Sequence, residues 1–314
     1  MLALGFALAS AVSVPAGHAQ MTERTVQLFV SAEPVVGTLT LPAGTDDVPG
    51  ALIVPGSGLV DRDGNFPGGR NDHLKLLAHG LAAHGIATLR IDKRGVGASR
   101  PVAPHEDHLD IWLYIADADR WLDRLRAEPR VGHVFILGHS EGALIATIAA
   151  QRVHPNGLIL LAGIGTKAGA TIRRQIDESG MAAPLRASAE RILSALERRE
   201  TVAEVEPELA ALFRPSVQPY LLSWLPIDPA AELAAVETPT LVVQGTTDIQ
   251  VTLEDARLLA ASRPGIESKT IDGMNHILKA APANRAANIA SYNDPSLPIV
   301  PELIPILVNF ITRH

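Results

Sequence analysis

The stretch from His133 to Arg152 limits what this chain can fold into more than any other. Val134–Leu137 is a short apolar run with three β-branched or aromatic residues, and it predicts a buried strand. Glu141–Arg152 is rich in Ala, Leu and Ile and predicts a helix. A G-x-S-x-G sequence centred on Ser140 lies between the two. The chain must therefore turn from strand to helix within a few residues.

A turn this tight crowds its own backbone, and glycines two positions before and after Ser140 remove the side chains that would clash. Such a turn lifts the serine hydroxyl away from the sheet and points it toward the start of the helix. Free N–H groups and the helix dipole favour negative charge there. The pattern predicts a nucleophile elbow. Because G-x-S-x-G also occurs by chance, the rest of the chain must provide a base, an acid and an oxyanion donor.

Predicted strands and helices alternate along most of the chain. The predicted strands are 25–30, 35–41, 51–54, 87–91, 134–137, 157–162, 240–244 and 267–271. The predicted helices outside the segment 165–230 are 72–86, 108–126, 141–152, 253–261 and 301–312. The first two strands form a hairpin, and short links between the later units predict a mostly parallel sheet with helices on both faces.

The segment from about 165 to 230 interrupts this alternation, because no strand is predicted in it. Leu185–Arg199 has an amphipathic helical pattern, and two shorter helices follow it. We expect an inserted helical cap over the carboxyl edge of the sheet, where such insertions border the ligand crevice. A peripheral subdomain away from the site is the alternative. Four apolar residues that follow the amphipathic helix are expected to roof an acyl pocket: Phe213, Leu221, Leu222 and Trp224.

The base is expected to be His276, because it follows the last predicted strand, where a parallel sheet places functional side chains. Asp248 likewise follows a strand and can hold the imidazole in one tautomer. Rival acids are Asp228, Asp255 within a helix, and Asp272 close to its own strand. His139 is expected to point away from the serine. Six other histidines are expected to lie in solvent: His73, His79, His84, His105, His108 and His154.

Composition narrows the chemistry. The chain of 314 residues has no cysteine, which excludes disulfides, thiolate catalysis and Cys-ligated metals. A net charge of -7 without a basic run gives no footprint for nucleic acid. Residues 1–19 are apolar and end in Gly17-His18-Ala19, which resembles a signal-peptidase site although a positive n-region is missing. We expect a periplasmic or secreted mature chain from Gln20 without a membrane span, or a cytoplasmic one if Met21 is the true start.

The order Ser140, Asp248, His276 is that of the α/β-hydrolases. The chain resembles this superfamily over nearly its whole mature length. Four stretches together resemble the bacterial EstD-like serine carboxylesterases: Pro55-Gly56-Ser57-Gly58 with Asp61-Arg62-Asp63-Gly64-Asn65, Asp92-Lys93-Arg94-Gly95, Gly138-His139-Ser140-Glu141-Gly142 and Gly245-Thr246-Thr247-Asp248-Ile249-Gln250-Val251.

The resemblance implies hydrolysis of a small-molecule carboxylic ester through an acyl-enzyme on Ser140, without a cofactor. It also implies oxyanion donors at the backbone N–H groups of Glu141 and of Ser57, with Gly58 as the alternative to Ser57. We expect a preference for short acyl chains. The alternatives are a peptidase of the proline-iminopeptidase type, for which Glu204, Glu206 and Glu208 are weak candidates to hold an α-ammonium, and a non-catalytic receptor on a hydrolase scaffold.

Three charged features have simpler interpretations. The Asp61 loop mimics a calcium loop, but its glycine is misplaced and no helix precedes it, so no metal is expected. The Asp92 turn has the wrong glycine pattern for a phosphate loop, and its charges are expected to pair with the Asp61 loop. The Glu141 side chain is expected to lean away from the nucleophile toward an arginine or a solvent channel.

Overall fold

The computed structural model describes residues 21–44, 46–103 and 105–314, so the expected signal peptide at 1–19 lies outside the described residues. In this part of the chain, eight strands form one sheet in the order β1-β2-β4-β3-β5-β6-β7-β8. The β1/β2 and β2/β4 pairs are antiparallel, and the other neighbouring pairs are parallel. The mostly parallel sheet predicted from the alternation is therefore confirmed.

The strands agree with the prediction to within a few residues at each end. They are β1 Thr22–Phe29, β2 Pro34–Leu41, β3 Val48–Val54, β4 Ala87–Ile91, β5 Val131–His139, β6 Gly157–Leu161, β7 Thr240–Gly245 and β8 Glu267–Ile271. The hairpin β1/β2 forms one edge of the sheet and β8 the other. The central strands β3 to β7 are almost wholly buried, as expected for strands covered on both faces.

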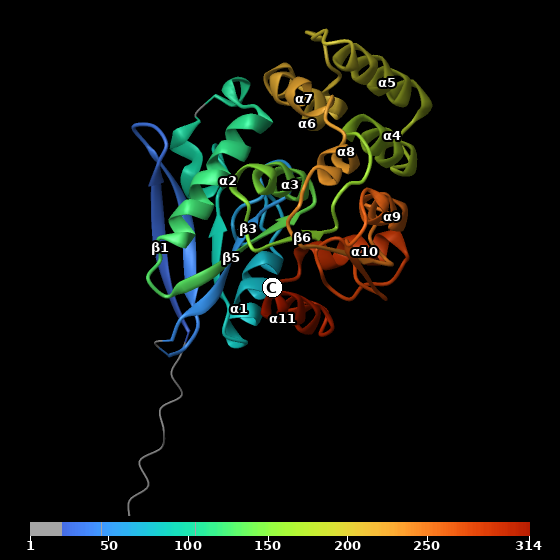
Figure 1. Ribbon diagram of the computed structural model, residues 1–314. Helices are drawn as coiled ribbons and strands as arrows, with labels where there is room; N and C mark the ends of the chain where they lie inside the picture. Colours follow the sequence, from blue (N-terminus) through green and yellow to red (C-terminus); the bar gives the residue numbers. More distant parts are fainter. Residues whose placement is uncertain (1–20, 45, 104) are drawn as a thin grey trace, which may run out of the picture.

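Helices pack on both faces of the sheet (Figure 1). Outside the insertion they are α1 His73–Ala83, α2 Ile111–Arg126, α3 Glu141–Val153, α9 Leu253–Ala261, α10 Arg285–Ala290 and α11 Leu303–Arg313. Alternate residues of β3 show the two layers. Leu52 and Val54 belong to the core that includes α2 and α3, whereas Ala51 and Ile53 belong to the core that includes α1 and α11. This period of two follows from the pleat of a strand.

A helical cap lies between β6 and β7 in the chain, and Figure 1 shows it gathered at the end of the molecule away from β1. Its helices are α4 Ala168–Glu178, α5 Ala183–Glu197, α6 Ala210–Phe213 and α7 Gln218–Trp224, and α8 Pro229–Ala234 returns the chain to the sheet. The cap buries its own apolar cluster, which includes Ile172, Leu193 and Phe213. Of the helices described, none is long and apolar enough to cross a bilayer.

Candidate active site

Ser140 occupies the turn between β5 and α3 with a backbone φ of 57° and ψ of -122°. A positive φ is rare for a residue with a Cβ, and it stores strain that the surrounding structure must hold. The Ser140 N–H donates to the carbonyl of Leu161 on β6 at 2.9 Å, and its own carbonyl accepts from the Ala143 N–H at 2.9 Å. Hydrogen bonds to both its N–H and its carbonyl therefore hold the backbone of Ser140 in place.

The glycines of the elbow are required by close backbone contacts. A Cβ on Gly138 would lie 2.1 Å from the carbonyl oxygen of Gly142, and one on Gly142 would lie 2.3 Å from the carbonyl oxygen of Val54. These oxygens belong to the backbone, so they cannot move away from an added Cβ as the end of a flexible side chain could. The predicted reason for the two glycines therefore holds in the structure.

Asp248 and His276 meet beyond the ends of β7 and β8. His276 Nδ1 lies 2.9 Å from Asp248 Oδ2, and both side chains are nearly fully buried. The other carboxylate oxygen of Asp248 accepts from the backbone N–H groups of Gln250 and Val251 at 2.8 and 2.9 Å. Gln244 also donates to Oδ2, at 3.1 Å. These hydrogen bonds hold the carboxylate of Asp248 in one position, and the carboxylate holds the ring of His276.

The same contacts set the charge of this carboxyl group. Burial alone would raise the pKa of Asp248, but the imidazole of His276 and the two backbone N–H groups outweigh burial and lower the pKa below its ordinary value. Asp248 is therefore ionised at neutral pH. An ionised carboxylate accepts a hydrogen bond from Nδ1–H and so leaves Nε2 of His276 with its lone pair.

The rival acids are used elsewhere. Asp255 caps α9, accepts from the Thr252 hydroxyl and pairs with Arg174 of the cap. Asp228 caps α8 through the first N–H groups of that helix. Asp272 accepts from the Thr246 hydroxyl at the surface. Of the acid candidates weighed from the sequence, the structure thus brings Asp248 to His276.

A cavity of about 200 Å³ brings Ser140, His276 and Ser57 together. It is small against the roughly 300–1,000 Å³ usual for ligand pockets. Ser57 follows β3 in the loop that carries Gly56, and a Cβ on Gly56 would lie 3.1 Å from that of Ser140. Glu141 begins α3, so its N–H has no partner within the helix. Both predicted oxyanion donors therefore adjoin the nucleophile.

Two more histidines line this cavity, and the expectation that His73 lies in solvent was wrong. His73 is 2% exposed, and its ring packs 4.9 Å from that of His139, which in turn packs 4.8 Å from that of His276. His139 also bonds through Nε2 to the His276 carbonyl at 2.7 Å, so it supports the loop of the base. Gly64 lies directly against the His73 ring, and the contact of His73 with His139 joins segments that helical spacing could not connect.

Both of these imidazoles are neutral. Burial, followed by the effect of His276, lowers the pKa of His139 to about 3. Burial, followed by the neighbouring His139 and His276, lowers the pKa of His73 well below its ordinary value. A positive charge on His276 would therefore not be repelled by positive charges on these two neighbours.

The expectation that the Glu141 side chain finds an arginine or a solvent channel was wrong. Glu141 is 1% exposed, and its Oε1 lies 3.1 Å from Nζ of Lys93, which follows β4. Lys93 is equally buried and also donates to the Gly56 carbonyl. Sequence reasoning missed Lys93, although its position at the end of a buried strand was the available signal.

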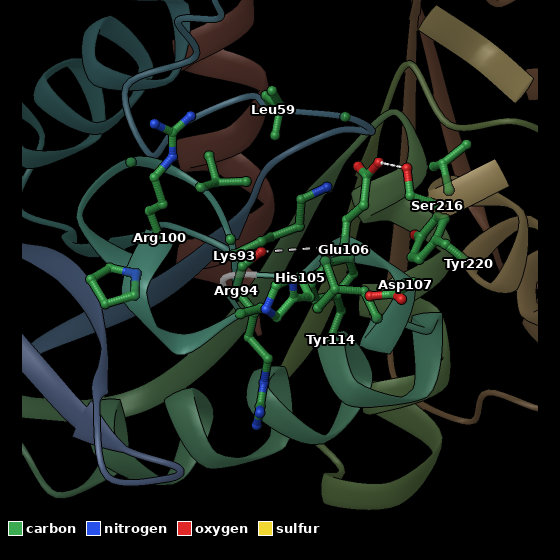
Figure 2. Close-up of a pocket in the computed structure, with 18 of the residues that line it drawn as sticks. Leu59, Lys93, Arg94, Arg100, His105, Glu106, Asp107, Tyr114, Ser216 and Tyr220 are labelled. Carbon is green, nitrogen blue, oxygen red and sulfur yellow. Dashed lines mark hydrogen bonds between the residues drawn. The ribbon is translucent and has the colours of Figure 1, made fainter. Parts of the chain in front are cut away.

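The four cap residues predicted to roof an acyl pocket lie in or against the apolar cluster of the cap. Phe213 and Leu221 are buried in the cap's own apolar cluster, and Leu222 and Trp224 pack against it. None of the four lines the cavity around Ser140 or a larger one of about 1090 Å³ beside the cap. Figure 2 shows that larger cavity, which the cap reaches instead through Arg214, Ser216, Val217 and Tyr220.

The two charged loops after β3 and β4 pair as expected. Asp92 accepts from the Arg62 N–H at 2.8 Å and forms an ion pair with the same arginine. The Asp61 carboxylate accepts from the N–H groups of Asp63 and Asn65, both at 2.9 Å. The carboxylate that begins the calcium-like sequence thus closes a turn of its own backbone.

Comparison with known proteins agrees with this architecture. Residues 68–209 match a hydrolase family described as serine aminopeptidase, S33. Over 245 residues the chain is 28% identical to Esterase EstD of Thermotoga maritima, which covers 77% of this chain. The chain spans 57% of the length of that curated relative.

Solved structures show the same fold at lower identity. Est1E from Butyrivibrio proteoclasticus is 17% identical with a TM-score of 0.59, and the match covers 92% of this chain and 99% of that one. The α/β-hydrolase GrgF from Penicillium sp. sh18 is 19% identical with a TM-score of 0.60, over 93% and 99% of the two chains. The chain has the α/β-hydrolase fold. In sequence it resembles the EstD-like esterases.

Proposed function

We propose that this protein is a serine carboxylesterase. The observation that carries the proposal is the hydrogen bond from His276 to the buried Asp248, in a cavity that also contains the strained Ser140. A serine hydroxyl needs a base to act as a nucleophile, and a base needs a fixed tautomer to accept its proton. Resemblance to an esterase supports the same reaction.

In the proposed mechanism, Nε2 of His276 takes the proton from the Ser140 hydroxyl as its oxygen attacks the ester carbonyl carbon. The charge that forms on the carbonyl oxygen is held by the N–H groups of Ser57 and Glu141. The imidazolium returns its proton to the departing alcohol, and the carbonyl carbon stays bonded to Ser140. Water then attacks this acyl-enzyme by the same route and releases the acid. Asp248 stays ionised throughout.

The substrate is proposed to be a small ester with a short acyl chain. The cavity around Ser140 has only about 200 Å³, so a long chain would have to leave it or displace its walls. No carboxylate occurs among the described residues that line it. An aminopeptidase would need such a group for the α-ammonium of its substrate. Of the cap acids, Glu206 is already paired with Ser188 and Arg191.

The test is a comparison of the native protein with Ser140→Ala on p-nitrophenyl esters and aminoacyl anilides. We expect ester hydrolysis by the native protein, and a loss of kcat of at least about 10⁴-fold in the variant with normal folding. A fluorophosphonate should label Ser140. As a control, Ser194→Ala removes an exposed cap hydroxyl that bonds to Glu190, and it should leave kcat and labelling unchanged.

Two results would contradict the proposal. A folded native protein that neither reacts with the fluorophosphonate nor hydrolyses any ester would favour a receptor. Hydrolysis of aminoacyl anilides at rates above those for esters would favour the peptidase.

A further inference from the structure

Lys93 lies between the two segments that provide the oxyanion donors. Its side chain is 3% exposed, although an ammonium is costly to remove from water. Nζ donates to the Gly56 carbonyl on one side and to Oε1 of Glu141, at 3.1 Å, on the other. It also lies 5.0 Å from the centre of the Tyr114 ring, and Figure 2 shows both residues at the larger cavity.

The contact with Gly56 has a direct geometric consequence for Ser57. The carbonyl of Gly56 and the N–H of Ser57 belong to one planar peptide unit, and in a trans peptide they point in opposite directions. An ammonium on the carbonyl side therefore fixes where the N–H points. It also draws electron density through the unit, because hydrogen bonds in a chain polarise one another.

This peptide unit packs against the nucleophile. A Cβ on Gly56 would lie 3.1 Å from that of Ser140, and Ser57 lines the same cavity as Ser140. A rotation of the unit would turn the N–H of Ser57 away from the place where the oxyanion forms. The second donor, the backbone N–H of Glu141, is also linked to Lys93, because the ammonium of Lys93 binds the side chain of the same residue.

We propose that Lys93 is a positioning residue that orients and polarises the oxyanion hole. It acts on the Ser57 N–H through the Gly56 carbonyl, and it holds Glu141 through an ion pair. The proposal rests on the esterase function proposed above. The plain alternative is that Lys93 only neutralises the buried carboxylate of Glu141.

Double variants separate these two roles. Lys93→Met alone would leave Glu141 buried without a partner, which is strongly destabilising. Lys93→Met with Glu141→Gln removes both charges together and leaves the Gly56 carbonyl without its cation. If Lys93 positions the oxyanion hole, kcat for p-nitrophenyl acetate should fall roughly 10- to 100-fold while KM stays within about threefold, because the interaction strengthens in the transition state.

A trifluoromethyl ketone gives a readout that a merely structural role would not move. It adds to Ser140 and carries an oxyanion, so its inhibition constant should rise by the same factor as kcat/KM falls. Lys93→Gln with Glu141→Gln is the second double variant. Its amide can still donate to Gly56 without a charge, so its kcat should lie between those of the native protein and the first variant. Thermal unfolding reports whether each variant folds.

The matched control removes the neighbouring ion pair. Arg94 follows Lys93 in the chain and binds Asp117 at 2.6 and 2.7 Å, without a contact to the Gly56 loop among the described residues. Arg94→Met with Asp117→Asn should keep kcat within about threefold, because neither donor depends on it.

Native kcat in either folded Lys93 double variant would overturn the proposal, as would a higher KM with unchanged kcat. Failure of the esterase function itself looks different. In that case the native protein already fails to hydrolyse esters or to react with a fluorophosphonate at Ser140.

Discussion

The strand-end loops and the helical cap differ in what their side chains do. The loops after β5, β7 and β8 bring Ser140, Asp248 and His276 to one edge because parallel strands all end there. Apolar side chains of the cap form a cluster of their own, and Tyr220 joins the core over α2 and α3. In this molecule, the order and direction of the strands place the candidate catalytic groups, whereas apolar side chains of the cap stabilise the cap itself.

The cap joins the rest of the molecule partly through charges. Arg214 forms a two-point ion pair with Glu106 from the segment after β4, and Ser216 donates to the same carboxylate. On its other side Arg174 pairs with Asp255 of α9. Apolar side chains of the cap are therefore poor predictors of the substrate pocket, because an amphipathic helix needs them for packing in any case.

The largest expected effect is on the elbow. Gly138→Ala would place a Cβ 2.1 Å from a backbone oxygen, so we expect a loss of about 3 kcal/mol or more in unfolding free energy, together with loss of activity. Gly132→Ala, in the same strand with nothing within 4 Å, should stay within about 0.5 kcal/mol. Urea unfolding of both variants measures the difference.

The cap provides the counterpart. Gly169 in α4 would place its Cβ 2.3 Å from Oε1 of Glu197, which is the end of a flexible side chain. Gly169→Ala should cost no more than about 1 kcal/mol, because the carboxylate can shift and alanine favours the helix. If Gly169→Ala were as damaging as Gly138→Ala, the contrast between a rigid elbow and an adaptable cap would be mistaken.

What could be predicted from the sequence follows the same division. The elbow is a local pattern, and Asp248 and His276 follow strands, so periodicity and strand order were enough to bring them together as candidates. The burial of His73 and Lys93 depends on contacts between segments far apart in the chain, with His139 and with Glu141. The helical pattern at His73 gave no sign of burial, and the position of Lys93 after a buried strand was a signal that the sequence analysis did not use.

A second contrast concerns acid. The cap segment 165–230 contains no histidine, whereas His73 and His139 are buried and neutral beside His276. The pKa of His139 is lowered to about 3 from an ordinary value of 6.5, and that of His73 is also well below it. When pH falls below 6.5, these two histidines bind protons in the unfolded chain but stay neutral in the folded chain. Their contribution to the unfolding free energy is therefore fully present above that pH and is lost as pH falls below it.

Between pH 7 and pH 5 the low pKa of His139 should lower the unfolding free energy by about 2 kcal/mol, and the lowered pKa of His73 should add to this loss. Urea unfolding across this range measures the slope. His73→Asn should make the dependence of the unfolding free energy on pH less steep, and exposed His84→Asn should leave it unchanged. A native slope of zero between pH 6 and pH 5 would show that the two imidazoles are not buried and neutral together.

The smallest effect on activity is expected from Trp224 of the cap. The ring packs on the cap cluster and lines neither cavity, so Trp224→Ala should cost about 1–2 kcal/mol of stability and leave the acyl preference unchanged. Val60 does line the cavity around Ser140. Val60→Ala should raise kcat/KM for octanoate relative to butyrate by about fourfold, the value of one buried methylene.

The measurement is kcat/KM for p-nitrophenyl acetate, butyrate, octanoate and palmitate in the native protein and both variants. The ratio between chain lengths within one variant cancels any general loss of activity, so the comparison reports the shape of the pocket. We expect the native optimum at acetate or butyrate. A shift toward octanoate in Trp224→Ala, with none in Val60→Ala, would mean that the acyl chain leaves the small cavity and runs beneath the cap. The cap would then contribute to specificity as directly as the strand-end loops do.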